Sequence, residues 1–224
     1  MKLWQTDAEL FVLVKQELFT CVVGDILDKL GRYHQFLPPK IQALREDMVV
    51  IGRALPVLAA DTQDPDAAMK KPFGRMLEAL DDLKPGEVYV NTGSSPRNAL
   101  WGGLMSTRAQ QLGAAGVVVN GYVRDTREIY RLNYPTFCFG RYGQDSAPRY
   151  QVVDFRVPIE IGDVRITPGD IIYGDIDGVL VVPRDCEAEV FRRALEKARG
   201  EKKVKQAIEA GMSAVAAFKK YGIM

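Results

Sequence analysis

An arginine and two carboxylates that lie close together in the chain, Arg124, Asp125 and Glu128, are the side chains best suited to chemistry. They follow Gly103 in the pattern G-x20-R-D-x2-E. Two carboxylates, with no histidine or cysteine in the motif, make a hard-oxygen site that suits Mg²⁺ or Mn²⁺ with several retained waters. The Arg124 guanidinium offers a planar, two-pronged donor to a carboxylate or an oxyanion beside that metal.

The elements around the motif are expected to bring its two halves together. The Gly102-Gly103 pair predicts a turn that opens a helix over residues 104–112. The apolar, β-branched run at 116–119 predicts a strand that is buried on both faces of a parallel sheet. A strand–helix–strand crossover then places the glycine turn and Arg124-Asp125 beyond the carboxyl ends of neighbouring strands, where open α/β sheets bind ligands.

The start of the predicted helix supplies a third kind of donor. The backbone amides of Gly102, Gly103, Leu104 and Met105 lie where a helix leaves its N–H groups without acceptors, so we expect them to bind the anionic end of a substrate. Metal, guanidinium and amides together suit a small 2-oxo acid whose enolate must be stabilised.

Two simpler interpretations of the motif stand beside this one. If a helix begins near Arg124, Asp125 and Glu128 share one face, and Arg124 and Glu128 can form an exposed pair four residues apart. Asp125 then only favours the N-terminus of that helix through its charge. Strings of the R-D-x-x-E type are common, and it is the placement after an apolar strand, opposite a Gly-Gly helix start, that favours a functional site here.

The surrounding sequence resembles the RraA-like family, which includes the metal-dependent 4-hydroxy-4-methyl-2-oxoglutarate/4-carboxy-4-hydroxy-2-oxoadipate aldolases. The likeness is carried by PGEVYVNTG, ALWGGLMSTRA and GVVVNGYVRDTREI around residues 86–129. The closing stretch PGDIIYGDIDGVLVVPRD at 168–185 and the early helix VVGDILDKLG at 22–31 are also similar to the family. The resemblance covers roughly residues 20–190.

The resemblance implies a role for each residue of the motif. Asp125 binds the metal, Glu128 holds a metal-bound water, and Arg124 holds the pyruvyl group of the substrate. Backbone amides of residues 102–105 complete the substrate site. Some relatives carry an acidic residue where this chain has Gly103, so metal support here is expected to depend more on Glu128.

The resemblance also implies a fold and an assembly. The expected fold is α/β, with a layered core of the RraA-like, swivelling β/β/α type and flanking N- and C-terminal helices. We expect one RraA-like domain over residues 1–224, with its core at about 20–190 and with the helix at 1–19 and the helices over 185–224 as additions. The family implies a homo-oligomer, a trimer or a dimer of trimers, with sites near subunit boundaries.

Together these expectations predict a lyase that depends on a divalent metal, Mg²⁺ first and Mn²⁺ second. It would cleave a C–C bond of a 4-hydroxy-2-oxo acid to release pyruvate, and it would decarboxylate oxaloacetate through the same enolate. The alternative is an RraA-type regulatory protein that inhibits RNase E by binding it, without catalysis. A methyltransferase is disfavoured because no glycine-rich nucleotide loop follows a predicted strand.

Composition narrows the classes of function further. The 224 residues are 47% hydrophobic and long enough for one sizeable core. Lys+Arg 30 against Asp+Glu 29 gives a net charge of +1, so no global field attracts nucleic acid or a membrane surface. The first residues alternate charged and apolar types, which predicts a helix and not a signal peptide. We therefore expect a cytoplasmic protein with neither nucleic-acid nor membrane partners.

The reactive side chains exclude several mechanisms. His34 is the single histidine and lies in a polar loop, so multi-histidine zinc sites and histidine-based triads are excluded. The lysines lie in charged or turn-like contexts, which disfavours a Schiff-base aldolase. Cys21, Cys138 and Cys186 are widely spaced, and we expect buried thiols in a reducing compartment.

The rest of the chain predicts ordinary elements. Helices are expected at 7–18 and at 21–30, the second capped by Thr20. A strand over 48–60 should break at Pro56, and a helix should follow at about 64–80. A long charged helix is expected over 185–210. Before it, the chain is expected to form mostly strands, at 136–139, 151–157, 164–166, 170–173 and 178–182.

Two further features of the sequence have alternative interpretations. Asp175 and Asp177 form a second carboxylate pair, but D-G-V between two strands is more typical of a hairpin turn than of a metal site. Trp101 abuts the glycine pair, where it either lines a substrate pocket or packs in the core.

Overall fold

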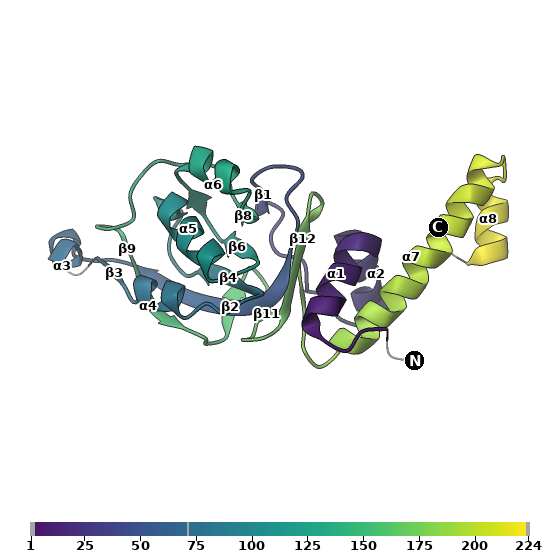
Figure 1. Ribbon diagram of the computed structural model, residues 1–224, viewed down its shortest axis with the longest axis horizontal. Helices are drawn as coiled ribbons and strands as arrows, with labels where there is room; N and C mark the ends of the chain where they lie inside the picture. Colours follow the sequence, from purple (N-terminus) through teal and green to yellow (C-terminus); the bar gives the residue numbers. More distant parts are fainter. Residues whose placement is uncertain (1–2, 71, 223–224) are drawn as a thin grey trace. The chain divides into compact units, whose positions relative to one another are not determined.

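The computed structural model describes residues 3–70 and 72–222 (Figure 1). The chain forms two compact units: an α/β unit over His34–Asp185, and a helical unit made of the chain up to Tyr33 and from Cys186 onward. The helix near residue 22, grouped with the core in the sequence analysis, therefore belongs to the helical unit. The prediction of one domain with terminal additions stays a prediction.

The helical unit is built on a long C-terminal helix. Helices α1 (Asp7–Glu17) and α2 (Thr20–Lys29) both pack against α7 (Glu187–Glu209), and α8 (Ala214–Tyr221) packs against α7 as well. Thr20 is not the cap of α2, because the helix begins one residue earlier than predicted and Thr20 is buried in its first turn. The apolar faces of α2 and α7 bury Val22, Val23, Ile26, Leu27, Val190, Phe191, Ala194 and Leu195.

The charged side of α7 carries ion pairs between successive turns of the helix. Pairs four residues apart link Arg192 to Glu196 at 2.8 Å and Arg193 to Glu189. Such exposed pairs contribute only a few tenths of a kcal/mol each, up to about 1 kcal/mol. Among the residues described, no helix is both long and apolar enough to cross a membrane.

The α/β unit is organised by one large mixed sheet in the strand order β1-β8-β6-β4-β2-β12-β13. The centre is parallel: β2 (Val50–Asp61), β4 (Glu87–Thr92), β6 (Gly116–Val119) and β8 (Thr136–Cys138). Antiparallel partners flank it: β1 (Gln42–Ala43), β12 (Ile171–Asp175), β13 (Gly178–Val182) and β9 (Tyr150–Phe155). Every residue of β6 is buried, as expected for a strand covered on both faces.

Helices α5 (Gly103–Gln111) and α6 (Thr126–Leu132) are the crossovers from β4 to β6 and from β6 to β8. They lie side by side with α4 (Met76–Asp81), and the three helices cover one face of the sheet (Figure 1). This arrangement is the layered α/β core that the sequence predicted. A small hairpin of β10 (Ile159–Ile161) and β11 (Val164–Ile166) completes the unit, and the first of these strands was missed in the sequence.

Strand β2 continues through Pro56, so the predicted break is wrong. Along one edge, β2 pairs with β4. Along its other edge, β2 pairs with β12 as far as Arg53 and with β9 from Val57 onward. Pro56 falls between these two partners, where a missing N–H removes no ladder hydrogen bond. Its carbonyl still accepts a 2.8 Å hydrogen bond from the Arg156 amide.

The helix predicted over 64–80 is also wrong. The chain instead forms α3 (Pro65–Lys70), the short strand β3 (Phe73–Gly74) and then α4. Pro72 explains the interruption, since a proline lacks the helical N–H and restricts the residue before it. Strand β3 pairs in parallel with β9 and brings α4 next to α5.

The second carboxylate pair is a hairpin turn. Strands β12 and β13 are antiparallel, and Asp175 pairs with Gly178 at the end of their ladder. The Asp175 carboxylate accepts a 3.0 Å hydrogen bond from the Asp177 amide, which is how aspartate commonly stabilises a tight turn. Sequence reasoning favoured this interpretation over a metal site, and the structure confirms it.

The cysteines differ in their surroundings, so the expectation of three buried thiols is wrong. Cys138 in β8 is buried, Cys186 is half-buried, and Cys21 on α2 is exposed. Burial raises the pKa of the Cys138 thiol to about 11. At neutral pH this thiol therefore stays protonated and weakly nucleophilic.

We predict that native protein at pH 8 reacts with a thiol-specific aromatic disulfide first at Cys21 and more than about tenfold more slowly at Cys138, because only the thiolate reacts. Peptide mapping by mass spectrometry measures both rates, and Cys21→Ser should remove the fast phase. Equal labelling of Cys138 in the folded protein would contradict its burial in the sheet.

Candidate functional site

Two short parallel strands bring the halves of the motif together. Strand β5 (Ala99–Trp101) pairs with β7 (Tyr122–Val123), apart from the main sheet. The Gly102-Gly103 turn follows the first strand and Arg124 follows the second, and the Arg124 amide donates to the Trp101 carbonyl at 3.0 Å. The predicted meeting of turn and arginine at adjacent strand ends is confirmed, although the strands that achieve it form a separate ribbon.

The two glycines allow this approach because neither carries a side chain. A Cβ atom on Gly102 would lie 2.9 Å from Asp125 Oδ2, and one on Gly103 would lie 3.0 Å from Glu128 Cβ and 3.1 Å from Asp125 Cβ. Contacts this short are not tolerated without displacement of the neighbours. A side chain at position 103 would therefore require Glu128 and Asp125 to shift by a few tenths of an ångström.

The Asp125 carboxylate faces the glycine turn instead of hydrogen-bonding to its own helix. It lies at the N-terminus of α6 in the left-handed conformation, with φ 55°, which aspartate adopts more readily than most residues. Its Oδ2 atom accepts a 3.2 Å hydrogen bond from the Gly103 amide. Asp125 is thus the N-cap residue of α6, where its charge still favours the helix N-terminus, but its carboxylate makes no capping hydrogen bond to that helix. The Gly103 amide also holds this carboxylate, which leaves the amides of Gly102, Leu104 and Met105 for a ligand.

Arg124 is held by a residue that the sequence analysis missed. Its Nη1 atom lies 2.8 Å from Asp145 Oδ1, while its Nε atom is 3.8 Å from Asp125 Oδ2. Asp145 comes from the loop between β8 and β9, and its Oδ1 also accepts a hydrogen bond from the Ser146 amide. No motif spacing links residue 145 to residue 124, so only the fold reveals this pair.

Glu128 lies beside the turn but points elsewhere. Its Oε1 atom pairs with Arg131 Nη2 at 2.5 Å, so the pair of Arg124 with Glu128 considered from the sequence is not the one that forms. The side chain is 36% exposed, and it is absent from the walls of the cavity described below. Its predicted contact with a metal through water stays a prediction.

The buried Trp101 side chain connects the glycine turn to the core of the α/β unit. It is 1% exposed, and its ring centroid lies 5.0 Å from that of Tyr89 and 6.3 Å from that of Tyr134. Its Nε1 donates to Ser106 Oγ at 2.7 Å, and this hydroxyl donates in turn to the Gly102 carbonyl at 3.1 Å. The indole therefore packs in the core and also lines the cavity described below, so both roles considered from the sequence are found.

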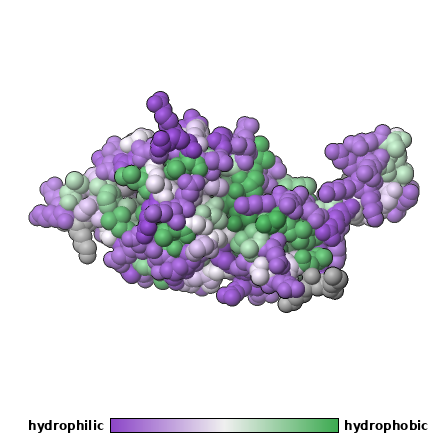
Figure 2. All heavy atoms as spheres, in the orientation of Figure 1, coloured by the Kyte–Doolittle hydropathy of each residue, from purple (hydrophilic) through white to green (hydrophobic). Residues whose placement is uncertain are grey.

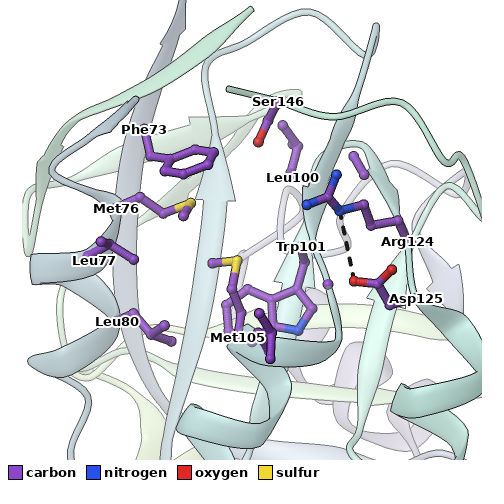
Figure 3. A pocket seen from close by; sticks show the side chains of 13 residues that line it. Phe73, Met76, Leu77, Leu80, Leu100, Trp101, Met105, Arg124, Asp125 and Ser146 are labelled. Atoms are coloured by element: carbon purple, nitrogen blue, oxygen red, sulfur yellow. Dashed lines mark ion pairs between the residues drawn. The ribbon is translucent and has the colours of Figure 1, made fainter. Parts of the chain in front are cut away.

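A cavity of about 220 Å³ opens between α4 and the turn (Figure 3). Arg124 and Asp125 lie on one side of it, and Trp101, Met105 and Leu100 lie between them and the opposite wall (Figure 3). Ser146 lies at one end of the cavity, and the wall that faces Arg124 is apolar. Charge is thus confined to one corner of an otherwise hydrophobic cavity.

The Asp125 carboxylate at this corner, with the Glu128 side chain beside the turn but outside the cavity walls, fits a hydrated divalent cation. Asp125 and Glu128 both flank Gly103, and their side chains are 52% and 36% exposed. Over residues 3–70 and 72–222, no three histidine, cysteine, aspartate or glutamate side chains converge into a closed cage for a metal. Mg²⁺ commonly binds through one or two carboxylates and keeps the remaining waters, so this donor set suits it.

We predict that Gly103→Ala destabilises the protein by about 1–3 kcal/mol, because the new Cβ must displace Glu128 and Asp125. Urea unfolding followed by fluorescence gives the free energy of unfolding. Gly143→Ala is the matched control, since a Cβ there meets open space and should change stability by less than about 0.5 kcal/mol. Equal stabilities for the two variants would contradict the close packing at the turn.

Comparison with known proteins agrees with this architecture. The sequence model of the RraA-like family, described as Aldolase/RraA, matches residues 20–181. A protein of Halalkalibacterium halodurans named "Putative 4-hydroxy-4-methyl-2-oxoglutarate aldolase" is 32% identical over 209 residues, which cover 93% of each chain.

Two solved structures share the fold. An uncharacterised protein of Pseudomonas syringae matches with a TM-score of 0.84 and 27% identity, over 99% of this chain and 98% of that one. RraAS2 of Streptomyces coelicolor, described as an unusual member of the RNase ES inhibitor RraA protein family, matches with a TM-score of 0.77 and 25% identity, over 90% of this chain and 98% of its own. The chain belongs to the RraA-like family.

Proposed function

We propose that the protein is a divalent-metal-dependent lyase that releases pyruvate from 4-hydroxy-2-oxo acids and decarboxylates oxaloacetate. One observation carries this proposal: Arg124, Asp125 and the Gly102-Gly103 turn converge at one corner of an apolar cavity. The name of the Halalkalibacterium halodurans relative supports an aldolase-type reaction. Mg²⁺ is the proposed ion and Mn²⁺ the second choice, because the donors are carboxylate oxygens.

Arg124 is assigned the carboxylate and the 2-oxo group of the substrate. Its guanidinium is planar and carries several N–H donors, so it can hold two oxygens of a 2-oxo acid in one plane. Asp145 occupies one of these donors, at Nη1, and thereby fixes the plane of the guanidinium. The amides of Gly102, Leu104 and Met105 lie at the start of α5, where the helix dipole favours the same anionic end.

Asp125 is assigned as the protein ligand of the metal, with Glu128 acting through water. A divalent cation held there supplies positive charge that stabilises the enolate oxygen. Asp125 is suited to this position because the Gly103 amide orients Oδ2 and leaves the other carboxylate oxygen available. The half-exposed setting of both carboxylates leaves room for water around them.

The bond changes follow from these positions. In the retro-aldol reaction the C3–C4 bond of the substrate breaks, the C4 hydroxyl loses its proton as it becomes a carbonyl, and the electron pair moves into the pyruvate enolate. We assign that proton to water oriented by Glu128. Protonation of the enolate at C3 gives pyruvate. Loss of CO₂ from oxaloacetate leaves the same enolate, so the same donors serve both reactions.

The family suggests a homo-oligomer, and we propose trimers or dimers of trimers with sites near the subunit boundaries. Regulatory binding is the second candidate function. It is favoured by the likeness to RraAS2, whose description names an RNase ES inhibitor family. A binding role needs neither a metal at Asp125 nor an enolate site at Arg124, and this difference separates the two proposals experimentally.

Oxalate, a planar dianion shaped like the pyruvate enolate, tests the proposal. A site that stabilises an enolate should bind this shape more tightly than it binds a 2-oxo acid. Calorimetric titration should therefore show oxalate binding to protein in Mg²⁺ and at least about tenfold weaker binding after chelation. Arg124→Lys should weaken binding by a similar factor, because lysine keeps the charge and loses the planar fork.

Arg97→Lys is the matched control, since Arg97 lies outside the cavity and should leave oxalate binding unchanged. Oxalate binding of equal strength with and without Mg²⁺, or no binding at all, would remove the enolate mechanism and favour the regulatory role.

A further inference from the structure

The wall of the cavity opposite Arg124 is made of hydrocarbon side chains. Phe73 from β3 and Met76, Leu77 and Leu80 from α4 face the arginine across the open space (Figure 3). Met76 and Leu80 are buried, whereas Leu77 is 58% exposed at the rim. Apolar surface reaches the outside over α4 and α5 (Figure 2). Within the part of the chain that the structure describes, Arg124 is the one cationic residue that lines this cavity.

Two arginines of the helices around this wall, Arg75 and Arg108, are engaged elsewhere. Arg75, at the start of α4, donates to Glu78 at 3.0 Å and to Asp154 at 2.6 Å, and its guanidinium stacks over the Phe155 ring. Arg108 of α5 pairs with Asp81 at 2.8 Å. Both guanidinium groups are therefore turned to partners outside the cavity, and neither lines it.

Phe73 is held in this wall at a cost in backbone energy. Its φ of 71° lies in the left-handed region, which a bulky aromatic residue rarely adopts. Pairing of β3 with β9 fixes the conformation, and the Arg75 amide adds a 2.9 Å hydrogen bond to the Val152 carbonyl. Strain of this kind is retained where the surroundings enforce it, and it is concentrated at functional sites. Here its result is an aromatic ring that faces the cavity (Figure 3).

We propose that this site takes 4-hydroxy-2-oxo acids whose substituent on C4 is uncharged and apolar, in preference to those that carry a second carboxylate there. The inference rests on the lyase function proposed above and specifies its substrate class. With the 2-oxo acid end fixed at Arg124 and the glycine turn, the C4 substituent extends toward Phe73, Met76 and Leu77. An apolar group gains from burial against this wall, whereas a carboxylate loses its hydration there and meets none of the cations that the structure describes in this subunit.

The products follow from the same bond cleavage. The C3–C4 bond breaks, the C4 hydroxyl loses its proton, and C4 leaves as the carbonyl carbon of an aldehyde or ketone that bears the apolar substituent. The electron pair and one proton remain with the three-carbon fragment as pyruvate. No oxidant or reductant is needed, because the reaction only redistributes one electron pair.

Two substrates of nearly equal shape test the proposal. In 4-hydroxy-5-methyl-2-oxohexanoate, C4 carries an isopropyl group, and in 4-hydroxy-2-oxoglutarate a carboxylate takes its place. Pyruvate released by each in the presence of Mg²⁺ is measured by liquid chromatography, with oxaloacetate as a third substrate. We expect kcat/KM to be at least about tenfold higher for the isopropyl compound, a typical discrimination by an apolar pocket.

Leu77→Arg provides the second arm of the test. Because Leu77 is largely exposed, an arginine there keeps its charge in water and places a cation at the rim of the cavity. It should raise kcat/KM for the dicarboxylate by about fivefold and lower it for the isopropyl compound. Val153→Arg, on an exposed strand position outside this cavity, adds the same charge and should change neither value. Thermal unfolding checks that both variants are folded.

The outcomes separate the inference from the function on which it rests. Pyruvate from both substrates, with the dicarboxylate equal or preferred, would overturn the apolar-substituent proposal and leave the lyase in place. No pyruvate from either compound or from oxaloacetate would overturn the lyase itself. The expected result is a preference for the isopropyl compound that becomes smaller in Leu77→Arg and stays unchanged in Val153→Arg. This result would support both the lyase function and the apolar-substituent proposal.

Discussion

The close approach of the Gly102-Gly103 turn to Arg124 and Asp125 is the constraint on which the site depends. Hydrogen atoms in place of two Cβ atoms let Asp125 Oδ2 come within 3.2 Å of the Gly103 amide. That contact turns the carboxylate away from its own helix and toward the cavity. A larger residue at either position would separate the helix start, the guanidinium and the carboxylate, which are useful only together.

The rest of the α/β unit maintains this approach. The β5–β7 ribbon sets the register of the two strand ends, and Trp101 anchors the turn through Ser106 to the core below it. Burial raises the pKa of Tyr134 beside this indole, so its phenol stays neutral in the packing. Asp145 then fixes Arg124 from a distant loop. Rigid supports of this kind, and not the charged groups alone, give a catalytic site its geometry.

The sequence predicted the elements whose signals are local, and it failed where the outcome depended on distant partners. The helix after Gly103, the buried strand at Gly116–Val119 and the hairpin at Asp175 each have a short pattern of their own. Pro56 was misread because its tolerance depends on which strands flank it. The partner of Arg124 was missed for the same reason, because Asp145 becomes its neighbour only through the fold.

The most direct test of the metal-dependent lyase is pyruvate release from oxaloacetate by wild-type protein and by Asp125→Asn, each with Mg²⁺ and with chelator. Asp177→Asn, in the exposed hairpin turn, is the matched control because it removes the same charge far from the motif in sequence. We predict turnover by wild type and the control in Mg²⁺ only, and a loss of at least about a hundredfold in Asp125→Asn. Undiminished, chelator-resistant turnover by Asp125→Asn would contradict the account.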